Sequence, residues 1–355
     1  MTTVQSVRSR QSGFSLVEIM VGITISLILL AGVLQIFNSS RQSYRVQEAS
    51  SRIQENGRFA MAFLARDLRM AGYAGCMQDA PVDSTLNNSS STLWDFDVGI
   101  EGFDDVGASL PSRLNVVDTD IEEGTDVVII RRMAGSPVRI TKNNNSAQLF
   151  AEVTGVEDDA CPDDTDRVSG LCQNDIVMVS DCSKSRVFQI TNLQTTGGGS
   201  EVNVVHSASG DPGNAESSWG GSSDPEEEQF GQGAELHRME TIIYFIGDGI
   251  DGPGLFRKVA DGDAEELVPG IRDMQLRYGV DTNGDRSINA FRDAGSVSDW
   301  ENVMSARAEF LTYSQRDFLA DDPVSLNYDG GTFSAPDQRL YRVFETTATL
   351  RNRAP

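Results

Sequence analysis

Residues 13–37 read GFSLVEIMVGITISLILLAGVLQIF, and this apolar stretch decides how the rest of the chain can fold. It holds 24 residues from Phe14 to Phe37, of which only Glu18 is ionisable. With a rise of 1.5 Å per residue, a helix of that length spans about 36 Å, enough to cross a bilayer with some tilt. A secretory signal peptide would instead have a shorter apolar core that ends at a small-residue cleavage site. The stretch therefore predicts a membrane-spanning helix.

The start of this stretch indicates a processing signal that precedes the apolar core. Arg8 and Arg10 are basic, the first 13 positions contain no acid, Gly13 directly precedes Phe14, and Glu18 is the fifth residue after Gly13. This combination resembles the type IV prepilin motif, in which a short basic leader is followed by Gly, Phe and an apolar run with Glu at its fifth position. The alternative is an ordinary N-terminal membrane anchor with a stray glutamate.

The resemblance implies that residues 1–13 are a leader peptide, which a prepilin peptidase removes after Gly13 before a methyltransferase modifies the new Phe14 amine. It also implies a partner for Glu18, namely the Phe14 amine of the same or a neighbouring subunit. A carboxylate in the middle of a bilayer costs about 2.5–3.5 kcal/mol, so such a residue normally has a partner. A salt bridge of this kind can set the axial register of an assembly, because a wrong offset leaves both charges unpaired.

The charge balance excludes one class of function. The 355-residue chain has 53 acidic and 29 basic residues, a net charge of −24. A nucleic-acid-binding surface needs clustered Lys and Arg, whereas the basic residues here are scattered, so we expect no nucleic-acid partner. Acidity of this kind mainly keeps an exported domain soluble.

Four cysteines, Cys76, Cys161, Cys172 and Cys182, follow the apolar stretch. An even number beyond a membrane span indicates an oxidising compartment and disulfides, and the spacings are too long for a CxxC site. Cys161 and Cys172 enclose a ten-residue Asp-rich loop that is easily closed. Cys76 follows the long helix and Cys182 lies between two predicted strands, so their pairing would tie the helix end to the sheet. Four cysteines allow three connectivities, and free buried thiols are the alternative.

The helix can continue beyond the membrane, because no proline occurs before Pro81. Small and apolar residues recur at three- and four-residue steps and predict one buried stripe: Ile53, Gly57, Ala60, Phe63, Leu64, Leu68 and Ala71. Gly72 and Gly75 are the expected stop signals. We therefore expect an assembly half at residues 14–37 and a periplasmic half at 38–75, with its stripe under a sheet. The alternative for the stripe is the core helix of an unrelated domain.

Residues 76–355 are expected to form a β-rich globular domain. Residues 76–113 are turn-rich, and residues 207–232 are rich in Gly, Ser and acids and predict a mobile surface loop. The strand signals are Asp126–Arg131, Asp175–Ser180, Arg186–Thr191, Val202–His206, Thr241–Ile246, Leu255–Val259, Ile271–Val280, Ala306–Tyr313 and Tyr341–Leu350. No helical pattern separates them, which favours an antiparallel sheet and an α+β, pilin-like fold.

Four segments spread along the chain carry a second, narrower resemblance. They read GRFAMAFLARDLRMAGYAGC at Gly57–Cys76, DIVMVSDCSKSRVFQIT at Asp175–Thr191, GIRDMQLRYGVDTNGD at Gly270–Asp285 and YRVFETTATLRNR at Tyr341–Arg353. Together they resemble the PilW family of minor pilins. The resemblance implies a structural subunit of the inner membrane that primes pilus assembly or forms the pilus tip. Its implied partners are other minor pilins, the major pilin and a PilY-type tip adhesin.

Two other functions fit the same membrane-tethered layout. The prepilin motif alone does not separate a pilin from a J-type pseudopilin of type II secretion. A periplasmic ligand-binding module on a membrane tether is the alternative from a different class.

Residues 281–285, reading DTNGD, are a weak calcium candidate, because oxygen-bearing side chains alternate there as in the first ligands of an EF-hand loop: Asp281, Asn283 and Asp285. The pattern then departs, since Arg286 replaces the glycine and Arg292 replaces the bidentate glutamate. A β-turn at Asn283-Gly284 between two strands is the favoured interpretation. The acidic cluster beside Cys161 is interpreted as solvated loop charge, and its members are Asp158, Asp159, Asp163, Asp164 and Asp166.

Signals for catalysis are weak. The only histidines, His206 and His237, have no metal-ligand spacing, and the sequence contains no GxSxG, phosphate-loop or HExxH motif. We therefore expect a protein that is not an enzyme, needs no cofactor and is itself the substrate of processing enzymes.

Overall fold

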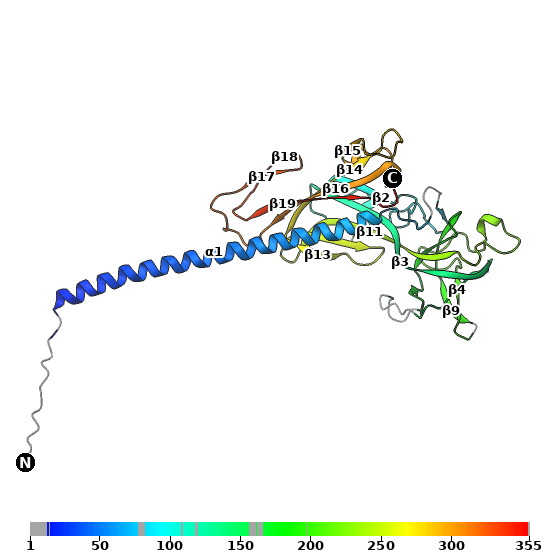
Figure 1. Ribbon diagram of the computed structural model, residues 1–355, viewed down its shortest axis with the longest axis horizontal. Coiled ribbons are helices and arrows are strands. Elements are labelled where there is room, and N and C mark those ends of the chain that lie inside the picture. The colour runs from blue at the N-terminus through cyan, green and yellow to red at the C-terminus, as the bar shows by residue number, and fades with distance from the viewer. Residues whose placement is uncertain are drawn as a thin grey trace, which may run out of the picture.

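The structure is a computed structural model that describes residues 13, 15–76, 82–107, 109–117, 120–155, 161, 166–196 and 198–353. A single helix, α1 (Leu16–Met70), dominates its outline, and the first half of α1 stands clear of the globular body (Figure 1). The helix ends where the sequence predicted, because Gly72 has a φ of +66° and Gly75 a φ of +67°, a left-handed conformation that glycine adopts without steric cost.

The larger of two main sheets has eleven strands among the described residues. They are β1 (Asp83–Ser84), β2 (Ile100–Val106), β3 (Thr125–Asn145), β4 (Gln148–Glu152), β7 (Ile176–Ser180), β8 (Ser185–Gln189), β9 (Asn192–Thr196), β10 (Glu201–Val205), β11 (Glu235–Gly249), β12 (Gly252–Val259) and β13 (Glu265–Pro269). The pairing of β1 with β8 is parallel, and the other strand pairs of this sheet are antiparallel.

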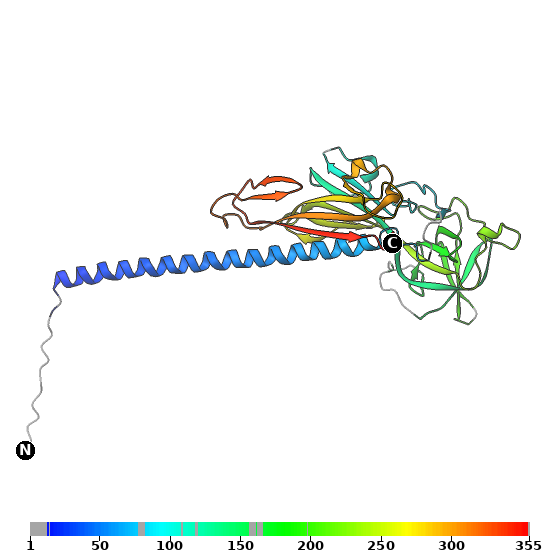
Figure 2. The same cartoon turned by 45° about the horizontal axis from the view of Figure 1, so that its top comes forward.

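Two long strands, β3 and β11, connect the two ends of this sheet. The first part of β3 pairs with β2 and its last part with β4. The first part of β11 pairs with β7 and its later part with β12. The strands β4, β7, β8, β9 and β10 therefore form a distal lobe, which lies past the C-terminal end of α1 (Figures 1 and 2).

The smaller main sheet has the strand order β15-β14-β16-β19 and is antiparallel. Its strands are β14 (Ile271–Val280), β15 (Ala290–Arg292), β16 (Val303–Tyr313) and β19 (Tyr341–Thr349). Two short hairpins, β5 (Arg167–Val168) with β6 (Leu171–Cys172) and β17 (Ser325–Tyr328) with β18 (Gly331–Ser334), complete the strands. Short 3-10 turns are η1 (Ser112–Leu114), η2 (Glu226–Glu228), η3 (Ala294–Ser296) and η4 (Trp300–Asn302).

The second half of α1 packs on the four-stranded sheet, mainly on β19 and β16. Its buried residues are Ile53, Gly57, Ala60, Leu64, Ala65, Asp67 and Leu68. The predicted stripe is confirmed, except that Phe63 is only half-buried and that Ala65 and Asp67 are added. Polar contacts close both ends of this interface. Asn56 donates to the Pro269 carbonyl at 2.8 Å, and the Arg351 amide donates to the Arg69 carbonyl at 2.9 Å.

Every predicted strand has a counterpart, and the α+β fold with antiparallel sheets is confirmed. The prediction for residues 76–113 was incomplete, because the strands β1 and β2 form within them. The sequence of β2, IEGFDDV, has three acids and a glycine, and these mask the alternation of apolar and polar residues that identifies a strand.

The surface-loop prediction for residues 207–232 is wrong for the aromatic residues of that segment. Trp219 and Phe230 are fully buried in the core of the distal lobe, although the segment has little regular structure. Trp219 stacks on His206 with ring centroids 4.1 Å apart. The Gly-, Ser- and acid-rich composition obscured these two aromatics, whose burial outweighs the polar character of their neighbours.

Gly57 provides a test of the helix–sheet contact. A Cβ atom built there would lie within 2.6 Å of three ring atoms of Phe344 on β19. Helix propensity alone predicts that Gly57→Ala stabilises by about 1 kcal/mol, whereas overpacking costs about 1–3 kcal/mol. We expect the packing cost to prevail and the unfolding midpoint of the detergent-solubilised chain to fall. Gly32→Ala is the matched control, since nothing lies within 4 Å of its added Cβ. A rise in the unfolding midpoint of Gly57→Ala would contradict this close contact.

Candidate functional site

The first half of α1 presents a continuous apolar surface. It is the one candidate membrane span among the described residues, with a mean hydropathy of 2.4 in its most apolar window and no buried residue there. The residues between Leu16 and Phe37 are all exposed, and no part of the described globular body packs on them. An apolar surface of this extent is covered either by lipid or by helices of other subunits.

Glu18 lies in the first turn of this helix. Its Oε2 atom accepts a hydrogen bond from the amide of Ser15, the N-cap residue, at 3.0 Å. The carboxylate thus satisfies one of the free amides at the helix start, and its charge is favourable next to the positive end of the helix dipole. No described residue forms an ion pair with it.

The processing site is partly outside the described residues. Gly13 is described and exposed, with nothing within 4 Å of the position that a Cβ would take. Phe14 and residues 1–12 lie outside the described residues, so the predicted Phe14–Glu18 ion pair stays a prediction.

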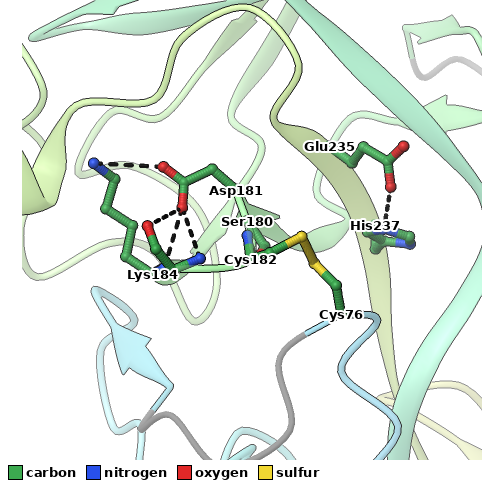
Figure 3. The surroundings of a disulfide bond; sticks show 8 residues. Cys76, Ser180, Asp181, Cys182, Lys184, Glu235 and His237 are labelled. Atoms are coloured by element: carbon green, nitrogen blue, oxygen red, sulfur yellow. Dashed lines mark hydrogen bonds and ion pairs between the residues drawn. A yellow bond between two sulfur atoms is a disulfide. The ribbon is translucent and has the colours of Figure 1, made fainter.

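Two disulfides join the four cysteines in the predicted pairing. Cys76 bonds to Cys182 across 106 residues, with a Cα–Cα distance of 5.2 Å (Figure 3). Cys161 bonds to Cys172 across 11 residues, with a Cα–Cα distance of 5.5 Å. The first bond ties the chain just after α1 to the β7–β8 loop of the distal lobe, and the second closes a local loop.

The β7–β8 loop is well suited to present Cys182. The Asp181 carboxylate accepts hydrogen bonds from the amides of Ser183 and Lys184 at 3.0 and 3.1 Å, and it forms an ion pair with the Lys184 ammonium at 3.5 Å (Figure 3). Cys182 itself has a left-handed φ of +70°. The turn is therefore held by its own side chains, and the disulfide fixes it to the end of α1.

The calcium candidate forms a compact loop between β14 and β15. The Asp281 carboxylate accepts hydrogen bonds from the amides of Asn283, Gly284 and Arg286 at 2.7–3.0 Å. Asp285 accepts from the amide of Ser287 at 2.9 Å. This geometry fits the favoured turn between two strands, although the connection is longer than a two-residue hairpin. Calcium binding stays a prediction, and of the acidic cluster beside Cys161 only Asp166 lies within the described residues.

The environments of both histidines are those of packed structural residues. Burial lowers the pKa of His206 to about 4, so that this ring is neutral where it stacks on Trp219. Burial also lowers the pKa of His237, whose Nε2 lies 3.5 Å from a carboxylate oxygen of Glu235 near the Cys76–Cys182 bond (Figure 3). Within the described part of the chain, no group of three His, Cys, Asp or Glu side chains could hold a metal ion.

A polar link between helix and sheet was missed in the sequence. Asp67 on α1 is only 4% exposed, and its Oδ2 accepts a hydrogen bond of 2.7 Å from the Tyr244 hydroxyl on β11. Its Oδ1 lies 3.4 Å from the Arg132 guanidinium on β3. The available signal was an acid next to Leu68, within the span of the apolar stripe. The link fixes the rotation of α1 relative to the larger sheet.

Comparison with known families agrees with this geometry. The family model described as Type IV Pilus-assembly protein W matches residues 243–352, and the model described as Prokaryotic N-terminal methylation motif matches residues 8–34. The first match begins in β11 and contains the whole four-stranded sheet that carries α1. No match was found among curated proteins or among solved structures.

An exposed apolar half-helix with a methylation motif, continued into a half-helix that packs on an antiparallel sheet, is the layout expected of a pilin-like subunit. With the pilus-assembly match in its sheet domain, the two matches support a minor pilin of the PilW family, related to the type IV pilus. This is a structural family rather than a catalytic one.

The two disulfides are expected to contribute unequally to stability. Replacing Cys76 and Cys182 by Ser should lower the free energy of unfolding by about 4–5 kcal/mol, because a longer closed loop restricts the unfolded chain more. Replacing Cys161 and Cys172 by Ser is the matched control, with an expected loss of about 3 kcal/mol. Urea unfolding of the solubilised chain, followed by tryptophan fluorescence, measures both. A larger loss for the Cys161–Cys172 pair would contradict the expected order.

Proposed function

We propose that this chain is a minor pilin that primes type IV pilus assembly, or forms the pilus tip, together with other minor pilins. Before assembly it is held in the inner membrane by the first half of α1, with its globular domain in the periplasm. The observation that carries the proposal is the exposed apolar half of α1, which follows a methylation motif and is joined without interruption to the family's sheet domain. The major pilin and a PilY-type tip adhesin are the further proposed partners.

The proposed assembly step uses the charge of Glu18. A prepilin peptidase cuts after Gly13, and the new amine of Phe14 then lies beside Ser15, whose amide already bonds to Glu18. In a neighbouring subunit the same amine can pair with this carboxylate at only one axial offset. Wrong offsets leave an unpaired carboxylate in lipid, at a cost of about 2.5–3.5 kcal/mol. The pair therefore selects one register between adjacent helices.

The pilus-assembly match over residues 243–352 favours this proposal over a J-type pseudopilin. A tethered ligand-binding module would have no use for the Glu18 charge. Mutation of Glu18 therefore separates a fibre subunit from a tethered module.

Glu18→Gln is the decisive variant, because a glutamine can still accept the Ser15 hydrogen bond while the charge is lost. We expect normal expression, membrane insertion and folding. Recovery of this chain with other pilins from membranes should fall about tenfold, as a lost coupling of about 1.4 kcal/mol would cause, and surface fibres should become fewer.

Glu55→Gln is the matched control, since it removes one exposed acid from the second half of the same helix. It should leave co-purification and fibre number unchanged. Normal values for Glu18→Gln as well would show that the carboxylate is not an assembly determinant and would favour the tethered module.

A further inference from the structure

The loop between β16 and β17 displays an exposed aromatic side chain. Phe318 is 74% exposed and has a left-handed φ of +58°. A bulky side chain rarely adopts this backbone conformation, so the surrounding contacts must hold it there. An aromatic ring kept in solvent by a constrained backbone indicates a contact surface.

The loop is fixed by several hydrogen bonds. The Oδ1 atom of Asp317 accepts from the amides of Phe318 and Gln338 at 2.6 and 3.0 Å. The amides of Leu319 and Ala320 donate to the Gln338 carbonyl at 3.0 and 2.9 Å. Phe318 is therefore presented by a defined loop on the body.

This loop touches α1 directly above the apolar half. The Gln42 side chain donates to the Phe318 carbonyl at 3.3 Å. Gln42 follows Phe37 by five residues, which places it about 7.5 Å along the helix axis. In Figure 1 the loop that precedes β17 is the part of the body that reaches farthest along α1 toward its N-terminal end. The polar headgroup layer extends roughly 5–8 Å beyond the hydrocarbon core on each side, so Phe318 lies at the level of that layer.

We infer that Phe318 is a second membrane contact, which inserts into the headgroup layer of the bilayer that holds α1. This inference rests on the membrane anchorage proposed above. Aromatic side chains are favoured at the membrane interface. The Arg41 guanidinium lies 4.2 Å from the centre of the Phe37 ring, so its charged end is beside the last residue of the apolar half.

The charges around this contact are nearly balanced. Arg41, Arg45 and Arg316 form no ion pair with described residues, and they are matched by acids in the loop itself: Asp317, Asp321 and Asp322. The contact is therefore an aromatic one that does not require anionic lipid. It holds the globular body in one orientation on the membrane and is lost when the subunit is extracted into a fibre.

Phe318→Trp tests the contact in the full-length chain. The variant is reconstituted into phosphatidylcholine vesicles whose acyl chains are brominated near the headgroup, because bromine quenches tryptophan only at short range. The native tryptophans lie at the other end of the body: the Trp300 carbonyl accepts a hydrogen bond from Arg353, Trp94 and Tyr73 pack on the same apolar cluster, and Trp219 is in the distal lobe. The wild-type chain therefore gives the background level of quenching from the native tryptophans.

Ile288→Trp is the matched control. Ile288 is 40% exposed in the loop that follows β14, at the end of the four-stranded sheet where Leu350 and Arg351 meet Met304 and Arg69. Arg69 is 27 residues beyond Gln42, about 40 Å along the helix.

We expect the brominated lipids to remove about a quarter of the emission of Phe318→Trp, one tryptophan in four, and to leave Ile288→Trp and the wild type unchanged. If the Phe318→Trp fluorescence is not quenched in a chain that resists alkaline extraction, the inference is overturned while the membrane anchorage stays supported. The partner of the loop is then a neighbouring pilin. Equal quenching of both variants would also overturn it. A chain that alkali extracts would refute the anchorage, and the inference with it.

Discussion

Between Ile53 and Leu68, small side chains on one face of α1 let the helix lie directly on the four-stranded sheet. Gly57 leaves room for the Phe344 ring, and Ala60 and Ala65 continue the close approach. A larger residue at these positions would push the sheet away and expose the core beneath it. Because α1 continues from this contact into its apolar half without a proline, the membrane-facing half and the body are held as one unit.

This constraint explains how the chain divides into parts. The pilus-assembly match covers the sheet that carries α1, while strands β4, β7, β8, β9 and β10 of the distal lobe lie outside it. The lobe has its own apolar core around Trp219 and joins the rest through β3, β11 and the Cys76–Cys182 bond. The matched part of the fold thus carries the helix, and the disulfide holds the distal lobe to the helix end.

The sequence was sufficient where local patterns determine the outcome. The three- and four-residue steps from Ile53 to Leu68 predicted the buried stripe, and two glycines predicted its end. The position of Cys76 after the helix and of Cys182 between strands led to the observed pairing. The candidate site followed from a short motif, Gly13, Phe14 and Glu18, which needs no tertiary information.

The remaining features depend on contacts between distant residues. Asp67 meets Tyr244 across 177 positions of the chain, and no local pattern reports such a pair. Trp219 is buried because Phe188 and His206 reach it from outside the 207–232 segment, whereas composition alone described its surroundings as a polar loop. The left-handed backbone of Phe318 is imposed by the neighbourhood of Gln338, 20 positions farther along the chain.

A processed fibre subunit carries a new N-terminus in assembled fibres, and that N-terminus can be identified. Fibres sheared from the cell surface are purified, and the N-terminal peptide of this chain is identified by mass spectrometry. We expect a peptide that begins at Phe14 and carries a methyl group on its amine. A chain found only in the membrane fraction, with residues 1–13 still attached, would contradict it.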